Sequence, residues 1–229
     1  MTDLVSSNNL IQRYQAVRTE VDALAKQHKQ AVTLLAVSKK HTSESITAVY
    51  QQGQRCFGEN YVQEGVDKVN ALHDLDIQWH FIGPIQSNKT RLVSEHFSWV
   101  HTIDRDKIAQ RLNDHRPAHL PALNVLIQVN ISDENSKSGI KLNEVAELAS
   151  MINQQPNLTL RGLMCIPALQ DEAQLKNEFT AMSRAYEHLQ QQYDDVDTLS
   201  MGMSGDLELA IACGSNMVRI GTAIFGQRN

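Results

Sequence analysis

The stretch VTLLAVSK, residues 32–39, is almost continuously apolar until it reaches its terminal serine and lysine. A strand that is buried on both faces has this composition, as in parallel sheets covered by helices. The stretch NVLIQV, residues 124–129, has the same character. Further short runs follow along the chain, and together they predict eight strands: 32–39, 55–60, 78–83, 99–104, 123–131, 160–166, 198–203 and 217–225.

Helical patterns separate most of these runs, and the clearest of them lie at 43–52, 104–114, 142–154, 171–193 and 206–213. Strands that alternate with helices predict parallel βαβ units. Eight such units in a chain of 229 residues predict a (β/α)₈ TIM barrel. We expect one domain over residues 1–229, and an open doubly wound sheet is the alternative fold.

An extra helix is expected before the first strand, over residues 4–30. Its apolar residues recur at spacings of three and four, which places them on one helix face. These residues are Leu10, Tyr14, Val17, Val21 and Leu24.

Composition excludes several classes of function. The net charge of -5 does not indicate the basic surface that binds nucleic acid. No apolar run approaches the ~18 residues that a membrane-spanning helix needs. The polar N-terminus lacks the basic segment followed by an apolar segment that a secretory signal has, so we expect a cytoplasmic protein. Cys56, Cys165 and Cys213 are widely spaced and odd in number, which indicates reduced thiols rather than disulfides. No metal site is expected, since Pro117 interrupts the helical spacing of His115 and His119.

Lys39 and Lys40 end the first predicted strand. In a barrel, chemistry gathers at the carboxyl ends of the strands. Side chains alternate across a strand, so only one of the two lysines can enter the barrel mouth. Lys39 shares its facing with Val37. A lysine in a pocket of low dielectric loses its proton more easily, and the free amine can attack an aldehyde. Two solvated charges at a strand end are the alternative.

Two loops rich in small residues follow the seventh and eighth predicted strands. Ser204, Gly205 and Asp206 precede a helical pattern, and Gly221 and Thr222 follow strand eight. Loops at these places commonly hold phosphate in barrels, and a helix N-terminus offers N–H groups to an anion. The simpler interpretations are an N-cap role for Ser204 and an ordinary turn at Gly221.

Closure of the barrel places strand eight beside strand one, so the two loops meet Lys39. An aldehyde held by its phosphate in these loops has its carbonyl within reach of the lysine, and pyridoxal 5′-phosphate is such an aldehyde. Arg219 faces the same way as Gly221 and can bind the phosphate or donate to the pyridine nitrogen. A guanidinium on that nitrogen leaves the ring a poor electron sink. The alternative for Arg219 is a salt bridge at the barrel rim.

The sequence closely resembles the pyridoxal phosphate homeostasis proteins. The signatures that carry this resemblance are AVSK at 36–39, FGENYVQE at 57–64, WHFIG at 79–83, QSNK at 86–89, GLM at 162–164, LSMGMS at 199–204 and VRIGTAIFG at 218–226.

The resemblance implies a fold like the barrel domain of alanine racemase, with the cofactor bound to Lys39 as a Schiff base. It implies phosphate contacts from Ser204, Gly221 and Thr222, with Arg219 near the ring or the phosphate. It also implies a role in vitamin B6 and amino-acid balance without established turnover. Gly205 stands where an acidic residue is expected in some relatives, which makes the phosphate loop roomier.

Other polar residues have weaker assignments. Asn60 can orient the cofactor ring or the lysine, and Tyr61 can donate a proton. Lys137 is a candidate second aldehyde acceptor that passes the cofactor on. His80 and His101 lie on strands three and four, where hydrogen-bonded core histidines are expected rather than ligands.

Three functions compete at this point. The first is a non-catalytic carrier of pyridoxal phosphate, expected to be a monomer and to serve apo-enzymes that need the cofactor. The second is an amino-acid racemase, which needs a base on each face of its substrate, with Tyr61 as the second base. The third is a Schiff-base aldolase acting on a sugar phosphate, which uses the same lysine and is colourless as purified.

Overall fold

The computed structural model describes residues 2–134, 137–168 and 171–227, and side chains from residue 9 onward. Its strands form a closed parallel barrel in chain order, and β8 pairs with β1. The barrel predicted from the sequence is therefore confirmed, and the open doubly wound sheet is wrong. The strands are β1 Thr33–Val37, β2 Cys56–Glu59, β3 Gln78–Phe81, β4 Trp99–Ile103, β5 Leu123–Val129, β6 Leu158–Cys165, β7 Thr198–Ser200 and β8 Met217–Ile220.

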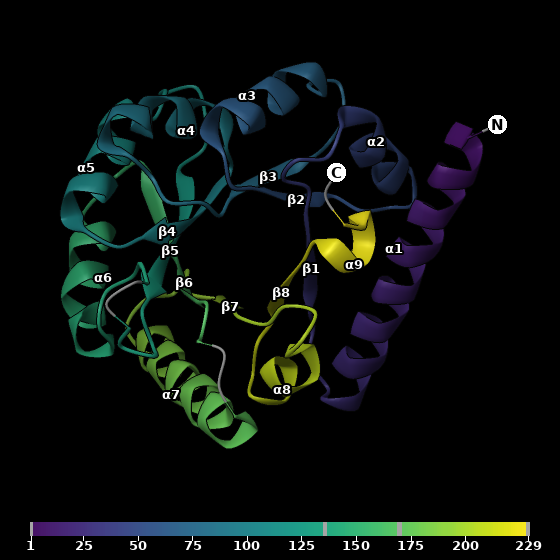
Figure 1. Ribbon diagram of the computed structural model, residues 1–229. Coiled ribbons are helices and arrows are strands. Elements are labelled where there is room, and N and C mark those ends of the chain that lie inside the picture. The colour runs from purple at the N-terminus through teal and green to yellow at the C-terminus, as the bar shows by residue number, and fades with distance from the viewer. Residues whose placement is uncertain (1, 135–136, 169–170, 228–229) are drawn as a thin grey trace.

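Helices surround the barrel and alternate with its strands (Figure 1). They are α1 Thr2–Gln27, α2 Ser43–Gln51, α3 Val62–Ala71, α4 Thr90–His96, α5 Asp106–His115, α6 Val145–Asn153, α7 Glu172–Gln190, α8 Leu207–Ala212 and α9 Thr222–Phe225, with short 3₁₀ turns at Ser87–Lys89 and Leu142–Glu144. No helix of these described segments is long and apolar enough to cross a membrane.

Most strands are shorter than the predicted ranges, and the two clearest cases are the seventh and the eighth. The seventh stops at Ser200 rather than at 203, and the eighth stops at Ile220 rather than at 225. The apolar residues of 223–225 form the single helical turn α9 instead. A short apolar run does not distinguish a strand from a helical turn, because apolar residues such as Ile224 and Phe225 are buried in either structure.

The extra N-terminal helix takes the place of a full-length eighth helix. The expected amphipathic face is confirmed, because all five of its apolar residues are buried. Helix α1 runs beside α2, α8 and α9 (Figure 1), where it covers the junction of β8 and β1. Arg13 on α1 donates from Nε to the carbonyl oxygen of Ile224 at 2.9 Å and from Nη2 to that of Phe225 at 3.2 Å. Helix α1 therefore holds α9 and the loop before it in place.

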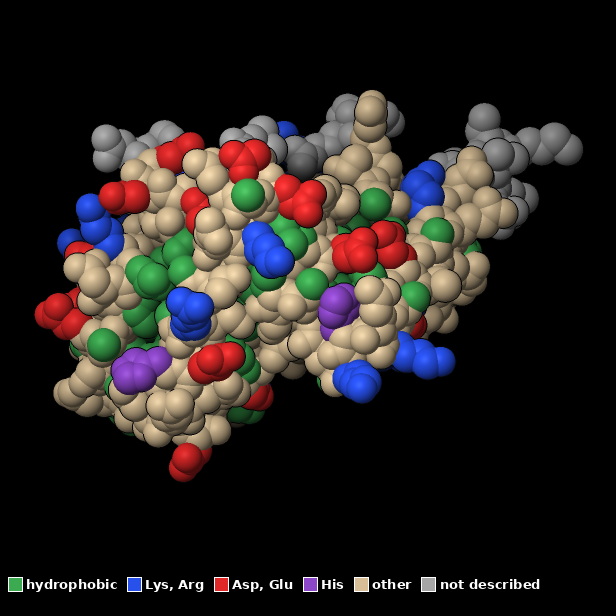
Figure 2. All heavy atoms as spheres, turned by 90° about the horizontal axis from the view of Figure 1, so that it is seen from below, with side chains coloured by type: hydrophobic (Ala, Val, Ile, Leu, Met, Phe, Trp, Pro, Cys, Tyr) green, Lys and Arg blue, Asp and Glu red, His purple; other side chains and the backbone are tan. Residues whose placement is uncertain are grey.

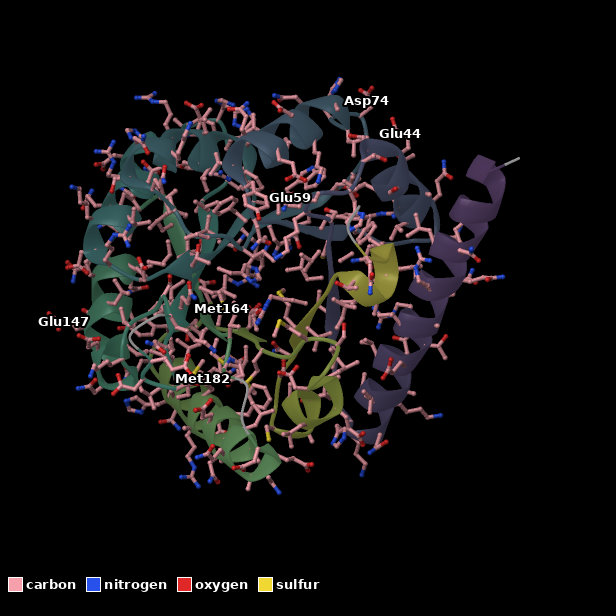
Figure 3. All side chains as sticks on the ribbon, in the orientation of Figure 1. Glu44, Glu59, Asp74, Glu147, Met164 and Met182 are labelled. Atoms are coloured by element: carbon pink, nitrogen blue, oxygen red, sulfur yellow. The ribbon has the colours of Figure 1, made fainter. Side chains whose placement is uncertain are left out.

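Apolar packing is concentrated outside the barrel, between the strands and the helices. One large cluster of buried residues fills this layer, which we call the sheath, and includes Phe57, Phe97 and Phe179. A much smaller apolar cluster lies inside the barrel and consists of Trp99, Leu126 and Met164. Figure 3 shows this difference in its two labelled methionines, since Met164 lies toward the centre of the barrel and Met182 is on α7, outside the barrel.

The outer surface mixes charges of both signs. On the face seen in Figure 2, acidic and basic side chains lie interspersed. This distribution accords with the modest net charge of -5.

Candidate functional site

A cavity of about 350 Å³ opens at the carboxyl ends of the strands. Cavities of this size commonly hold small ligands. The six cofactor-binding residues predicted from the sequence all line it, although they come from four separate parts of the chain. These residues are Lys39, Asn60, Ser204, Arg219, Gly221 and Thr222.

Lys39 reaches the cavity because hydrogen bonds to β2 hold the backbone just before it. The Ser38 N–H donates to the Gly58 carbonyl at 3.0 Å, one residue after β1 ends. The next residue, Lys40, is exposed and has a φ of 62°, so the chain turns sharply there. The prediction that only one of the two lysines enters the mouth is confirmed.

A buried charged cluster lies behind Lys39, between the sheet and α3. Lys68 Nζ donates to Glu59 Oε1 at 2.8 Å, to Glu64 Oε1 at 2.6 Å and to the Ser38 carbonyl at 2.8 Å. The Ser38 hydroxyl donates to Glu59 Oε1 at 2.6 Å, and the Lys40 N–H donates to Glu64. Figure 3 shows Glu59 beneath α3. The cluster therefore fixes the backbone on both sides of Lys39.

Burial raises the pKa of the Glu59 carboxyl, and the Lys68 ammonium opposes this rise. Its Oε2 atom is buried and has no hydrogen-bond partner among the described residues. The cluster is held by one shared oxygen, Oε1, which accepts from both Lys68 and Ser38.

The loops after β7 and β8 form one wall of the cavity with Ser204, Gly205, Gly221 and Thr222. A Cβ atom at Gly221 would lie 3.2 Å from the Val37 carbonyl oxygen, so this loop packs closely against β1. A Cβ at Gly205 would meet nothing within 4 Å, which agrees with the roomier loop expected there. Ser204 is not an N-cap, because Asp206 holds that position in α8 and no side chain caps the helix.

Arg219 is buried, with 5% of its surface exposed. Its Nη1 donates to Ser200 Oγ at 2.8 Å and its Nη2 donates to the Cys165 carbonyl at 2.8 Å. None of the ion pairs among the described residues involves Arg219. The alternative interpretation of Arg219, as part of a salt bridge at the barrel rim, is therefore wrong. Burial lowers the pKa of the guanidinium, which remains charged because its ordinary pKa exceeds 12.

Asn60 lies between two neighbouring cavities. Its backbone touches Gly83, where a Cβ atom would come within 2.0 Å of the Asn60 carbonyl oxygen. Its side-chain Oδ1 is buried and has no partner among the described residues. Asn60, Ile82 and Ile166 line the second cavity as well as the first. An acceptor is thus available to a ligand at the boundary of the two.

The second cavity has a volume of about 230 Å³ and includes Lys137. Lys137 Nζ lies 3.4 Å from the Ile166 carbonyl oxygen, and it pairs loosely with Glu134 at 3.8 Å. The two lysines singled out from the sequence therefore line adjoining cavities at the same barrel mouth.

Sequence reasoning missed His41, which also lines the first cavity. Its ring stacks on Phe225 of α9, with 4.9 Å between the centroids and 22° between the planes. The available signal was its position two residues after Lys39. The position alone was not decisive, because the stacking partner lies at the other end of the chain.

Tyr61 is 48% exposed and precedes α3 as its N-cap residue. It is not among the residues that line either cavity. His80 and His101 are fully buried and hydrogen-bonded to each other at 2.9 Å, which confirms the expectation of core histidines. His115 is the last residue of α5, and Pro117 lies beyond the end of that helix. The described residues contain no cluster suited to a metal ion.

Comparison with known proteins gives a consistent result. The family described as alanine racemase, N-terminal domain, matches residues 13–229. The pyridoxal phosphate homeostasis protein of Escherichia coli is 55% identical over 229 residues, covering 97% of this chain and 98% of that protein. The chain belongs to the pyridoxal phosphate homeostasis protein family. The member from Vibrio alginolyticus is 61% identical over 205 residues, covering 87% of this chain and 88% of that protein.

A similar solved structure supports the same fold. PipY of Synechococcus elongatus, in its structure with PLP bound, is 33% identical and has a TM-score of 0.82. The match covers 95% of this chain and all of the PipY chain. The resemblance deduced from the sequence motifs is thus confirmed.

Proposed function

We propose that this chain binds pyridoxal 5′-phosphate in the first cavity and serves intracellular vitamin B6 and amino-acid homeostasis. We further propose that Lys39 Nζ bonds covalently to the aldehyde carbon of the cofactor. The names of the relatives and the PLP-bound structure of PipY support the cofactor. One observation carries the proposal for this chain, namely the convergence of Lys39 with the two small-residue loops and Arg219 in one cavity.

The residues present fit such a ligand. Among the described residues, the hydrogen-bond partners of the buried Arg219 guanidinium are neutral, which favours a ligand that brings an acceptor or a negative charge. Asn60 Oδ1 offers an unused acceptor. The hydroxyls of Ser204 and Thr222, together with close backbone approach at Gly221, suit a phosphate group. When bound, pyridoxal phosphate supplies an aldehyde and an aromatic ring that can draw electrons.

The chain's own residues favour a carrier over an enzyme. Racemisation requires a second acid–base group opposite the lysine. Tyr61, the candidate for that role, is exposed and outside the lining of the cavity. Racemase turnover that disappears in Tyr61→Phe, or in His41→Gln, would instead favour the racemase.

The visible absorption spectrum of the purified protein tests the proposal. We expect a band from covalently bound cofactor in the wild type and in Lys40→Ala, and no band in Lys39→Ala. Lys40 is the matched control because it is adjacent but exposed and outside the cavity. A wild-type protein that stays colourless after addition of pyridoxal phosphate would contradict the proposal and favour the aldolase.

Cofactor delivery to apo-enzymes gives Lys137 a role as the second acceptor. Its cavity adjoins the first through Asn60, Ile82 and Ile166. We expect Lys137→Ala to slow transfer of the cofactor to an apo-enzyme, and Lys141→Ala, an exposed neighbour, to leave it unchanged. Equal transfer rates in the two variants would remove Lys137 from the path. We also propose that the protein acts in the cytoplasm as a monomer, with residues 1–229 as a single domain.

A further inference from the structure

A chain of hydrogen bonds runs through the barrel interior, from the cavity to the opposite end of the barrel. Arg219 Nη1 lies 2.8 Å from Ser200 Oγ, and Ser200 Oγ lies 3.4 Å from His101 Nδ1. His101 Nε2 lies 2.9 Å from His80 Nδ1, and His80 Nε2 lies 3.1 Å from Gln78 Oε1. Gln78 is exposed at the amino end of β3. This series of hydrogen bonds thus connects strands β3, β4, β7 and β8 across the barrel interior.

The two ends of this hydrogen-bond network together decide where its protons lie. Arginine can only donate, so Ser200 Oγ accepts from Arg219. The amide oxygen of Gln78 can only accept, so His80 has a proton on Nε2, and Nδ1 of the neutral ring accepts from His101 Nε2. The neutral His101 ring then has no proton on Nδ1, which accepts from the Ser200 hydroxyl. Each group therefore donates to the next one, from Arg219 to Gln78.

Burial and the neighbouring charge keep both histidines neutral. Burial lowers the pKa of His80 to about 3. Burial, His80 and the Arg219 charge hold the pKa of His101 well below its ordinary value. The His80 ring also stacks on Trp99, with 5.1 Å between the centroids and 14° between the planes, and this stacking fixes the orientation of the imidazole.

This arrangement holds Arg219 without neutralising it. A carboxylate partner would fix the guanidinium but would also cancel its charge. Ser200 and the Cys165 carbonyl fix it with neutral acceptors, and the remaining N–H groups stay available to the cavity that Arg219 lines. Networks of this kind rigidify their members when every donor and acceptor is satisfied.

We propose that Ser200, His101 and His80 are positioning residues, which hold Arg219 as a fixed and fully charged donor toward the ligand in the cavity. The inference rests on the proposed function, since the ligand is taken to be pyridoxal phosphate. The histidines act through Ser200 and Arg219 and do not contact the cavity themselves, because they are fully buried beneath it.

The first test measures proton positions in the protein without cofactor. Nitrogen–proton NMR correlation spectra of the imidazole rings distinguish the two neutral tautomers and the imidazolium. We expect His80 and His101 to be neutral and protonated on Nε2 throughout the range of about pH 5 to about pH 8. An imidazolium, or a proton on Nδ1 of either ring, would contradict the proposed direction of the hydrogen bonds.

The second test uses Ser200→Ala, with Ser200→Thr to restore the hydroxyl. Ser94→Ala is the matched control, since it removes an equally buried hydroxyl that donates to the Leu112 carbonyl in the sheath. We expect Ser200→Ala to weaken pyridoxal phosphate binding about tenfold and to shift the visible band of the bound cofactor. We expect Ser200→Thr to recover most of both properties, and Ser94→Ala to change neither.

Binding and spectra in Ser200→Ala that match those of Ser94→Ala would overturn the positioning role. Failure of the wild type to bind pyridoxal phosphate at all would instead overturn the proposed function, and this inference with it. The histidine tautomers are measured without cofactor, so they test the hydrogen-bond network even if the protein does not bind pyridoxal phosphate. This measurement distinguishes a failure of the network from a failure of the proposed function.

Discussion

The barrel interior and the sheath differ sharply in chemistry although the same eight strands build both. The sheath is apolar, with large side chains such as Phe57, Phe97 and Phe179 fully buried in it. The interior of a (β/α)₈ barrel is commonly filled by bulky branched residues. Here its middle contains a small apolar cluster and the polar chain from Gln78 to Arg219. The sheath therefore holds the fold together, and the interior serves the cavity above it.

The largest expected effect comes from the sheath. Phe179 of α7 is fully buried, and Phe179→Ala should reduce the free energy of unfolding by about 3–5 kcal/mol, because it leaves a cavity in close-packed surroundings. Urea denaturation measures the loss, and Phe179→Leu should lose less. The spectrum of the bound cofactor should be unchanged below the denaturation midpoint. If Phe179→Ala shifted that band as Ser200→Ala is expected to, the division between the two regions would not hold.

Lys68 is a charged exception within the apolar sheath. Lys68→Met removes the only cation that contacts the fully buried Glu59 carboxylate among the described residues. Breaking a buried pair in this way should cost about 3 kcal/mol of stability. Because Ser38 is in the same cluster, cofactor binding at Lys39 should weaken as well. Stability measured with and without pyridoxal phosphate separates the two effects. Unchanged cofactor affinity would show that the cluster supports only the fold.

Glu59 should make stability depend on pH. Burial raises its pKa, so the folded protein binds more protons than the unfolded chain between the unfolded pKa, about 4.3, and the folded one. Stability from this group is complete below the unfolded pKa and is lost as pH rises through the folded pKa. Glu59→Gln should remove this slope, so that the wild type loses stability relative to the variant as the pH rises above about 4. A relative gain by the wild type over that range would reverse the assignment.

The smallest effect is expected where α1 holds α9. Arg13→Met keeps the apolar stem but loses both bonds to the α9 carbonyls, which should cost about 1 kcal/mol. Because Thr222 begins α9, pyridoxal phosphate should dissociate several-fold faster. Arg18→Met is the control on the same helix, where the ion pair with Asp22 lies at the surface and contributes little. Equal dissociation rates in the two variants would show that α9 holds its position without α1.

Prediction from the sequence succeeded where the signal was local. The apolar runs identified the eight strands, and side-chain alternation separated Lys39 from Lys40. It failed at 223–225, where a buried helical turn has the same composition as a strand. The alternative interpretation of Ser204 as an N-cap is also wrong, since a serine before a helix can cap it only if the helix begins at the next residue, and α8 begins at Leu207.

The sequence by itself determined the barrel, the order of its strands and six of the residues that line one cavity, because period-two alternation and loop composition can be read along the chain. Only the tertiary structure decided which distant groups meet. It placed His41 on Phe225, Arg219 on Ser200, and His101 on His80. Those contacts cross the barrel between strands far apart in sequence, where the register and tilt of a closed sheet, rather than local residue pattern, decide which side chains come within hydrogen-bonding distance.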